Sequence, residues 1–245
     1  MKKSITGIVS LLLPSFLAVL ILKLLGHKIG KKVKIGFSFL FVDKMELADD
    51  SEIGHFNYIK IPFLNLKERA RIGKLNILKG PFSCVFDTKS LLNHKNKVTR
   101  SPKGISYGEA VLHLGELAII TVGHHIDLTR SISFGDFSIL AGIRSQMWTH
   151  GFYHAEQGKD RIRIDGEIQI GNNVYIGSGC IFNPGVKVGD AVHVGGGSTV
   201  SKALLKPGMY VGQALRYIET DYDTVKSKLS KIKDITLKVD AYEKK

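Results

Sequence analysis

Four side chains in the middle of the chain are of the types that move protons: His125, Asp127, His150 and His154. His125 and Asp127 lie in the segment GHHIDL, and His150 ends the segment MWTH. A free imidazole has a pKa of about 6.5, so it can take or give a proton at neutral pH. A neighbouring carboxylate can orient such a ring. Which of these side chains meet depends on the elements that carry them, and the sequence shows those elements as a repeat.

Aliphatic or aromatic residues recur at every sixth position over much of the chain. The same spacing covers 29–59, shifts by one residue over 66–84, restarts at Leu114 and slips by two before Phe134. Its unbroken part is Ile170, Ile176, Phe182, Val188, Val194 and Val200, with glycine often next. No helix or ordinary strand has a period of six. Three short strands with their turns would close a coil of about 18 residues, so the pattern predicts an all-β solenoid. Strands of a sandwich would instead alternate with a period of two.

Three segments depart from the repeat. Residues 85–104 are basic and predict a projecting loop, and residues 147–163 predict a second loop that contains His150. Functional groups often lie on such loops above a rigid scaffold. The last segment, 219–245, carries apolar residues at helical spacing and predicts a short charged C-terminal helix.

The N-terminal segment, 1–25, predicts a membrane-associated hydrophobic helix. Its residues 4–22 are uncharged and are flanked by lysines on both sides. As a helix they would extend about 28 Å, close to the thickness of a bilayer core. Pro14 would kink this helix, so both a spanning and an interfacial arrangement stay open, as does a helix that covers one end of the domain. The heavier lysine cluster after Leu22 predicts a location at the cytoplasmic face of the bacterial inner membrane.

The net charge of +13 does not indicate nucleic-acid binding. Residues 1–34 carry seven lysines without an acid, and 85–104 carry four lysines and one arginine against Asp87. These two stretches account for most of the excess, and no nucleic-acid-binding motif accompanies them. The two cysteines, Cys84 and Cys180, are too few for a disulfide scaffold and are expected to be reduced and buried.

The hexads, the run FGDFSILAGIRSQMWTH and the ending VGQALRYI together resemble the hexapeptide-repeat acyltransferases, and most closely the sugar O-acetyltransferases that use acetyl-CoA. The resemblance is good over 114–218 and rests on the repeat alone over 29–84. It implies a left-handed parallel β-helix over 26–218, a homotrimer, and acetyl-CoA as co-substrate bound between adjacent subunits.

The resemblance also implies roles for the proton-moving residues. His150 matches the family's general base, which takes the proton of a sugar hydroxyl as it attacks the thioester. His125 and Asp127 lie about one to one and a half coils of about 18 residues earlier. They are therefore candidates to orient His150 or the substrate, although they could equally be turn residues.

The acetyl-CoA site is expected on the later coils. The family pattern suggests Gly142 or the Ser178-Gly179 turn as oxyanion donor. Two stretches depart from the family and put the coenzyme contacts in doubt: 212–215 reads Gly-Gln-Ala-Leu where the family has Gly-Asn-Pro-Ala, and 202–207 is longer and less acidic. The residues expected to bind the coenzyme are Tyr175, Ser178, Gly179, Gly196, Gly197, Ser198, Lys202 and Arg216.

These observations predict an acetyl-CoA-dependent O-acetyltransferase acting on a sugar hydroxyl of a membrane-associated or lipid-linked glycan, or of a polysaccharide precursor. Two alternatives stay open. One is a non-catalytic β-helix scaffold at the membrane. The other is a zinc enzyme resembling the gamma-class carbonic anhydrases, although His150 and His154 are spaced differently from that family's ligands. No metal is expected.

Overall fold

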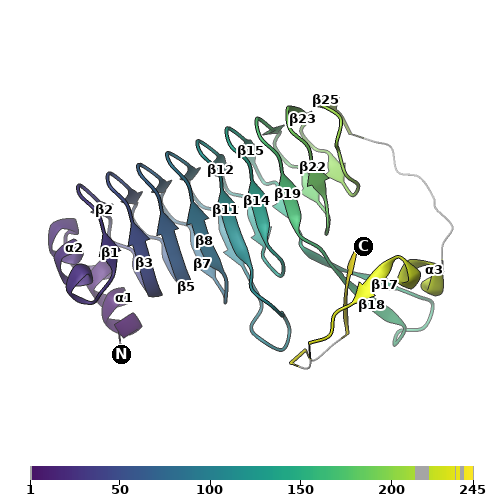
Figure 1. The fold of residues 1–245 in the computed structure, drawn as a ribbon, viewed down its shortest axis with the longest axis horizontal. Helices are drawn as coiled ribbons and strands as arrows, with labels where there is room; N and C mark the ends of the chain where they lie inside the picture. The colour runs from purple at the N-terminus through teal and green to yellow at the C-terminus, as the bar shows by residue number, and fades with distance from the viewer. Residues whose placement is uncertain (1, 213–220, 235, 238–239, 245) are drawn as a thin grey trace.

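Short parallel strands wind into a coil with three faces in this computed structural model (Figure 1). The structure describes residues 2–212, 221–234, 236–237 and 240–244. Each strand pairs with its equivalents one coil before and one coil after it. The predicted all-β fold, a left-handed parallel β-helix, is confirmed.

The three faces are named here in chain order around one coil. Face 1 consists of β2 (Lys34–Ile35), β4 (Glu52–Ile53), β6 (Arg71–Ile72), β9 (Leu91–Leu92), β12 (Ile119–Val122), β15 (Ile139–Ile143), β20 (Tyr175–Ile176), β23 (Val192–Val194) and β25 (Gly208–Tyr210). Face 2 consists of β7 (Ile77–Lys79), β10 (Lys97–Thr99), β13 (His125–Asp127), β16 (Gln146–Met147), β21 (Ile181–Phe182) and β24 (Thr199–Val200). Face 3 consists of β1 (Lys28–Ile29), β8 (Ser83–Phe86), β11 (Val111–Leu114), β14 (Ile132–Phe134), β19 (Ile168–Ile170) and β22 (Lys187–Val188). The long strands β3 (Phe39–Leu47) and β5 (Tyr58–Leu66) bend from face 2 into face 3.

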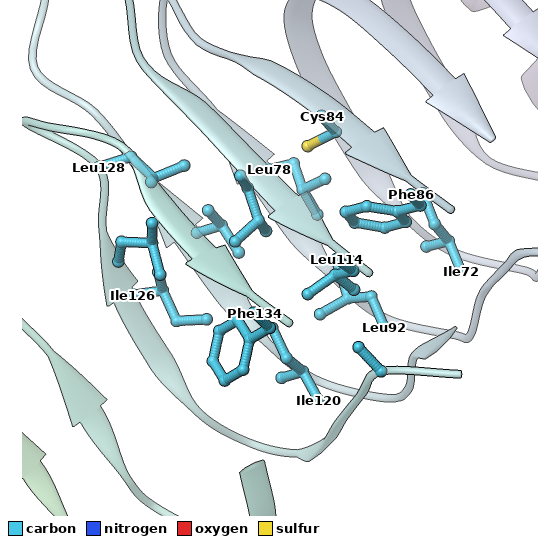
Figure 2. Packing of buried hydrophobic residues seen from close by; sticks show 14 of the residues in the cluster. Ile72, Leu78, Cys84, Phe86, Leu92, Leu114, Ile120, Ile126, Leu128 and Phe134 are labelled. Carbon is cyan, nitrogen blue, oxygen red and sulfur yellow. The ribbon is translucent and has the colours of Figure 1, made fainter. Parts of the chain in front are cut away.

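The hexad residues fill the interior of the coil. Leu114, Ile120, Ile126 and Phe134 are buried and stack on the side chains of neighbouring coils (Figure 2). Glycine follows many hexad residues because adjacent coils approach closely at the turn. A Cβ on Gly54 would lie 2.4 Å from the carbonyl oxygen of Gly73 in the next coil. The period of six therefore comes from one inward side chain and one tight turn in each strand unit.

Some positions differ from the predicted hexad frame. Phe41, predicted to point inward, is half-buried on the outside, and its neighbours Leu40 and Val42 are buried instead. The reason is that β3 is a continuous nine-residue strand, so its side chains alternate around the bend.

The predicted loop over 85–104 is wrong for most of its length. Strands β8, β9 and β10 occupy this stretch, and Phe86, Leu92 and Val98 continue the repeat as buried residues six apart. Lysines in this stretch, such as Lys95 and Lys97, lie between the buried positions and are exposed. In this part of the chain the coil is interrupted over 100–110, between β10 and β11.

The predicted loop over 147–163 does leave the coil, but it is a hairpin. Strand β17 (His150–His154) pairs antiparallel with β18 (Arg161–Asp165). The C-terminal segment adds to this hairpin: β27 (Ala241–Lys244) pairs with β18, and β26 (Leu229–Lys231) pairs with β27. The predicted short C-terminal helix is present as α3 (Tyr222–Ser227). Among the described residues after it, the apolar side chains of Leu229 and Tyr242 pack on the hairpin from strands.

The N-terminal segment forms two helices that cover the first coil (Figure 1). Helix α1 (Lys2–Leu12) and helix α2 (Ser15–Leu24) meet at Pro14, whose ring does not permit the helix to continue. The hydroxyl groups of Ser10 and Ser15 accept the free N–H groups of Leu40 and Ile35 in the first coil. The single helix predicted over 1–25 is therefore a pair of helices. The pair covers the open end of the solenoid and provides hydrogen-bond acceptors for N–H groups there. In the described part of the chain, neither this pair nor any other helix has both the length and the apolar character needed to cross a bilayer.

Truncating one interior hexad residue should destabilise the coil strongly. Phe134 is 1 % exposed and lies in the main cluster, so we expect Phe134→Ala to cost about 3–5 kcal/mol through the cavity it leaves. The matched control is Phe137→Ala at the following turn, where the ring is 56 % exposed and the change should cost about 0.5 kcal/mol or less. Thermal midpoints of the two variants measure the difference, and equal midpoints would contradict the interior packing.

Candidate active site

His150 and Asp127 meet at one edge of the coil. This edge, where each face 2 strand passes into face 3, is here called the loop edge; it bears the segments 100–110, 128–131 and 148–167. Asp127 ends β13, and His150 begins β17 in the next coil. The Nδ1 atom of His150 lies 2.9 Å from Oδ2 of Asp127. The predicted proximity of the two residues is thus seen in the structure, and Asp127 orients the ring.

The Asp127 carboxylate is held by its own turn and by the residue before His150. Thr149 donates its hydroxyl to Oδ2 at 2.7 Å and its N–H at 3.2 Å, and Thr129 donates to the same carboxylate from its N–H and hydroxyl. The Thr129 hydroxyl also lies 3.2 Å from Nδ1 of His150. Asp127 is 6 % exposed, whereas the His150 side chain is 31 % exposed. A fixed, buried carboxylate therefore supports a ring that reaches solvent.

The electrostatics of the pair follow from this arrangement. The hydrogen bond to Asp127 raises the pKa of His150 above its ordinary value, although burial of the ring opposes the effect. Burial alone would raise the pKa of Asp127, but the hydrogen bond and charge of His150 and the donors of Thr149 and Thr129 outweigh it and lower that pKa. Asp127 is therefore ionised at neutral pH. With Nδ1–H donated to Asp127, the Nε2 atom of neutral His150 presents its lone pair outward.

His125, also predicted as catalytic, lies on the same strand as Asp127, but its ring contacts Trp148. Its ring centroid is 5.1 Å from that of Trp148, and Trp148 stands edge-on to His150 at 6.3 Å. Burial lowers the pKa of His125, and Lys97 adds to this effect. The indole ring of Trp148 therefore contacts both His125 and His150. His154, at the other end of β17, is exposed.

The hairpin that carries His150 contains a buried ion pair, and one of its members also contacts the segment 100–110. Nε of Arg163 lies 2.9 Å from Oδ1 of Asp165, and both side chains are almost fully buried. Arg163 also donates to the carbonyl of Ile105 in the segment 100–110, and Gly166 donates its N–H to the carbonyl of Thr149 at 2.9 Å. Burial raises the pKa of Asp165 despite the charge of Arg163. Sequence reasoning missed Thr129, Arg163 and Asp165, because Thr129 reaches the site by the stacking of coils and the other two by the pairing of β17 with β18.

The residues predicted to bind the coenzyme lie along a second edge, where face 1 passes into face 2. This edge is here called the glycine edge and contains Gly142, the turn Ser178-Gly179 and the run 195–197. Gly179 and Gly197 have φ of +68° and +72°, and an added Cβ at either would meet no atom within 4 Å. The backbone there is open to a ligand, which suits a pantetheine arm. The N–H of Gly179 donates to the carbonyl of Ile143, which leaves Gly142 and Ser178 as the candidate oxyanion donors of the prediction.

The other predicted coenzyme residues surround this edge. Ser198 is buried and donates its hydroxyl to the carbonyl of Gly195 at 2.6 Å, so it shapes the turn. Tyr175, on face 1, is exposed and stacks on His193 at 4.8 Å between ring centroids. Ser198 and Lys202 line a cavity of about 430 Å³ at the end of the coil. Arg216 and most of the departing stretch 212–215 lie outside the described residues.

The two groups of predicted residues are not brought together within one chain, because face 2 separates the loop edge from the glycine edge. Over the residues that the structure describes, no three His, Cys, Asp or Glu side chains are grouped as a metal ion would require.

Comparison with known proteins places the repeat in context. Residues 167–202 match the family model described as bacterial transferase hexapeptide, six repeats. Over 108 residues the chain is 32 % identical to galactoside O-acetyltransferase of Escherichia coli K12, which covers 44 % of this chain and 53 % of that protein. The chain thus spans about half the length of this curated relative. The predicted resemblance to hexapeptide-repeat acyltransferases, and to sugar O-acetyltransferases among them, is confirmed.

Solved structures give matches of the same kind. A maltose O-acetyltransferase from Clostridium difficile 630 is 31 % identical over 44 % of this chain and 60 % of its own, with a TM-score of 0.37. A polysialic-acid-specific acetyltransferase, NeuO, is 15 % identical over 80 % of this chain and 85 % of its own, with a TM-score of 0.46.

Proposed function

We propose that this protein is an acetyl-CoA-dependent O-acetyltransferase that acts on a sugar hydroxyl. The observation that carries the proposal is the His150–Asp127 pair at 2.9 Å on a hexapeptide-repeat coil, with no hydrogen bond to Nε2 of the ring among the described residues. The similarity to a galactoside O-acetyltransferase supports acetyl transfer and a sugar acceptor. The open backbone at Gly179 and Gly197 fits the coenzyme as donor.

The proton path follows from the geometry of the pair. Acetyl-CoA supplies the acetyl group as a thioester. Nε2 of His150 accepts the proton of the sugar hydroxyl as its oxygen bonds to the acetyl carbon, and Asp127 stabilises the resulting imidazolium through Nδ1–H. Backbone N–H groups at Gly142 or Ser178 stabilise the negative charge on the carbonyl oxygen. When the carbon–sulfur bond breaks, His150 returns the proton to the thiolate, so the ring ends neutral.

The separation of the two edges supports a shared site in a homotrimer. His150 lies on the loop edge and the open glycines lie on the glycine edge of the same coil region, with face 2 between them. Rotation about a threefold axis can place one chain's loop edge against the next chain's glycine edge. Each trimer would then hold three equivalent sites between neighbouring subunits.

Release of CoA thiol from acetyl-CoA tests the proposed function. Purified protein is supplied with galactosides, nucleotide sugars and lipid-linked glycan extracts, and the products are examined by mass spectrometry. We expect acceptor-dependent thiol release together with a mass gain of one acetyl group on a sugar. No release with any acceptor and no binding of acetyl-CoA would overturn the proposal and favour the scaffold function.

Lys202 provides a test of the coenzyme site. Its exposed ammonium group borders the cavity beside Ser198, where it can pair with a coenzyme phosphate. We expect Lys202→Gln to raise the KM for acetyl-CoA about tenfold with little change in kcat, through loss of a charge-assisted hydrogen bond. The control is Lys95→Gln on an earlier coil, which should leave KM unchanged. If both variants behave like the wild type, the coenzyme phosphates bind elsewhere.

We propose further that the helical pair lies on the membrane surface, with the coil at the cytoplasmic face of the bacterial inner membrane. No acid precedes Asp43 in the sequence, and Lys2, Lys23 and Lys31 are exposed near the pair. An apolar surface rimmed by lysines suits the interface of anionic lipid. The exposed apolar side chains of the pair are Ile5, Ile8, Leu11, Leu12, Phe16, Leu17, Leu20 and Leu24. An acceptor attached to the membrane is the proposed substrate class.

Vesicle flotation measures this association. We expect the protein to float with vesicles containing anionic phosphatidylglycerol and to bind neutral phosphatidylcholine vesicles much less. Changing Phe16 and Leu20 to serine should reduce binding to both, because these side chains are 72 % and 57 % exposed. The control changes Phe56 to serine, an exposed ring on the coil. Equal flotation of all three proteins would contradict an interfacial helical pair.

A further inference from the structure

A row of outward side chains on face 2 connects the helical pair with the candidate catalytic residues. The strand register places Phe41 beside Lys60, Lys60 beside Lys79, Lys79 beside Thr99, and Thr99 beside Asp127. Adjacent strands lie about 4.8 Å apart, so four steps cover about 19 Å. The row therefore leads from the first coil to the carboxylate that holds His150.

The lysine end of this row borders a cavity. The cavity has a volume of about 360 Å³, and Lys3, Phe41, Lys60, Lys79 and Arg100 are among its lining residues. Asp43 is the acid that lines it, and Asp43 is paired with Lys3 at 2.7 Å. Within the described residues, neither Lys60 nor Lys79 has a carboxylate within ion-pair distance; Lys60 lies over the Phe41 ring. The cavity thus carries a clear excess of positive charge.

The strand register sets the positive charges of Lys60 and Lys79 side by side on face 2, where both side chains are exposed. Like charges at directly paired positions of neighbouring strands destabilise a sheet. An anion with several oxygens would bridge the two ammonium groups and remove this repulsion. Lys3 belongs to helix α1, and the exposed side chains of Ile5, Ile8 and Leu12 lie on the opposite side of the same helix, so one helix width separates the cavity from the apolar surface of the pair. The ligand that satisfies both features joins an anion to an apolar chain.

We propose that this cavity binds the diphosphate of a lipid-linked acceptor, and that the row on face 2 guides the attached glycan toward His150. The inference rests on the proposed function for the identity of the acceptor. A second cavity, of about 600 Å³, shares Pro62, Pro81 and Arg100 with the first and continues to Tyr107. Tyr107 lies beside Arg130 in the turn 128–131, next to the Asp127 carboxylate. The cavities thus follow the same direction as the row.

Calorimetry on the full chain in neutral detergent tests this site without an acetyl donor. The probes are inorganic diphosphate, farnesyl diphosphate and UDP-glucose. We expect Lys60→Gln with Lys79→Gln to weaken diphosphate binding about tenfold or more, because charge-assisted hydrogen bonds are lost. The control is Lys74→Gln with Lys187→Gln, which removes two exposed lysines elsewhere on the coil and should leave binding and thermal midpoint unchanged.

The outcomes separate this inference from the proposed function. Tighter binding of farnesyl diphosphate than of UDP-glucose supports the lipid-linked source, and the reverse order overturns it. Equal binding by the wild type and the Lys60/Lys79 variant, or no binding by the wild type, overturns the site itself. Acetyl transfer to a small neutral galactoside should be the same in the variant and the wild type. Its absence in both would count against the proposed function while leaving the binding result intact.

Discussion

Replacing His150 with glutamine should lower kcat for acetyl transfer by about 10²–10⁴-fold, the usual contribution of a positioned general base. The variant removes the basic ring nitrogen that takes the hydroxyl proton and keeps a side chain of similar size at the start of β17. The KM for acetyl-CoA should change little, because the coenzyme residues lie on the other edge. Initial rates of thiol release under saturating donor and acceptor measure the effect.

The matched control is His154→Gln at the other end of the same strand. His154 is exposed, and its ring contacts Phe152 rather than Asp127. This variant should keep the wild-type rate and thermal midpoint. His125→Gln gives a second comparison: because Trp148 separates His125 from His150, its loss should affect the rate far less. An unchanged rate in the His150 variant would show that His150 is not the general base.

Replacing Asp127 with asparagine should change the pH profile as well as the rate. The hydrogen bond to Asp127 raises the pKa of His150, and activity requires the neutral ring, so wild-type activity falls as the pH drops through this raised pKa. Without the carboxylate, burial of the ring is the largest remaining effect and lowers its pKa. The acid limb of the profile should therefore move to lower pH. The maximal rate should also fall, roughly ten- to hundredfold, because the ring is no longer held in one tautomer.

The measurement is kcat as a function of pH for the wild type and the Asp127→Asn variant. Nearby charges that could move the same limb are those of Arg163 and Asp165, which are paired with each other. Thr149→Val provides the control: it removes a donor to Asp127 but keeps the carboxylate, so the limb should stay close to that of the wild type. An unchanged acid limb in the Asp127 variant would show that the carboxylate does not act on the base.

The coil was predictable because its sequence signal is local and repeated. Ile176, Phe182 and Val188 each need the same inward position and the same turn, so the spacing alone defines the solenoid. The stretch 85–104 was misjudged because the frame slips there by two residues to Phe86, Leu92 and Val98, and the lysines between them conceal the pattern. Phe41 was misplaced for a related reason, since a long bent strand replaces two short ones.

The candidate site was predictable only in part. Coil length placed Asp127 near His150, but it could not separate the role of Asp127 from that of His125, because strand orientation decides which side chain reaches the ring. Thr129, Arg163 and Asp165 gave no motif. Thr129 reaches His150 from the preceding coil, and Arg163 and Asp165 join the site because β18 pairs with β17. The hairpin and its partner strand β27 lie outside the repeat, so no periodic pattern in the sequence indicates that they pair.

The early coils, from β2 to β10, carry none of the candidate catalytic side chains, yet they lie between the helical pair and His150. They act as a spacer of fixed length, in which each turn of the solenoid adds about 4.8 Å. Deleting one whole turn, such as residues 54–72, would keep the catalytic pair intact and bring it nearer to the helical pair, which we propose to lie on a membrane, by that amount. The number of turns would then set the distance between the helical pair and His150, and with it which sugar of a tethered glycan receives the acetyl group.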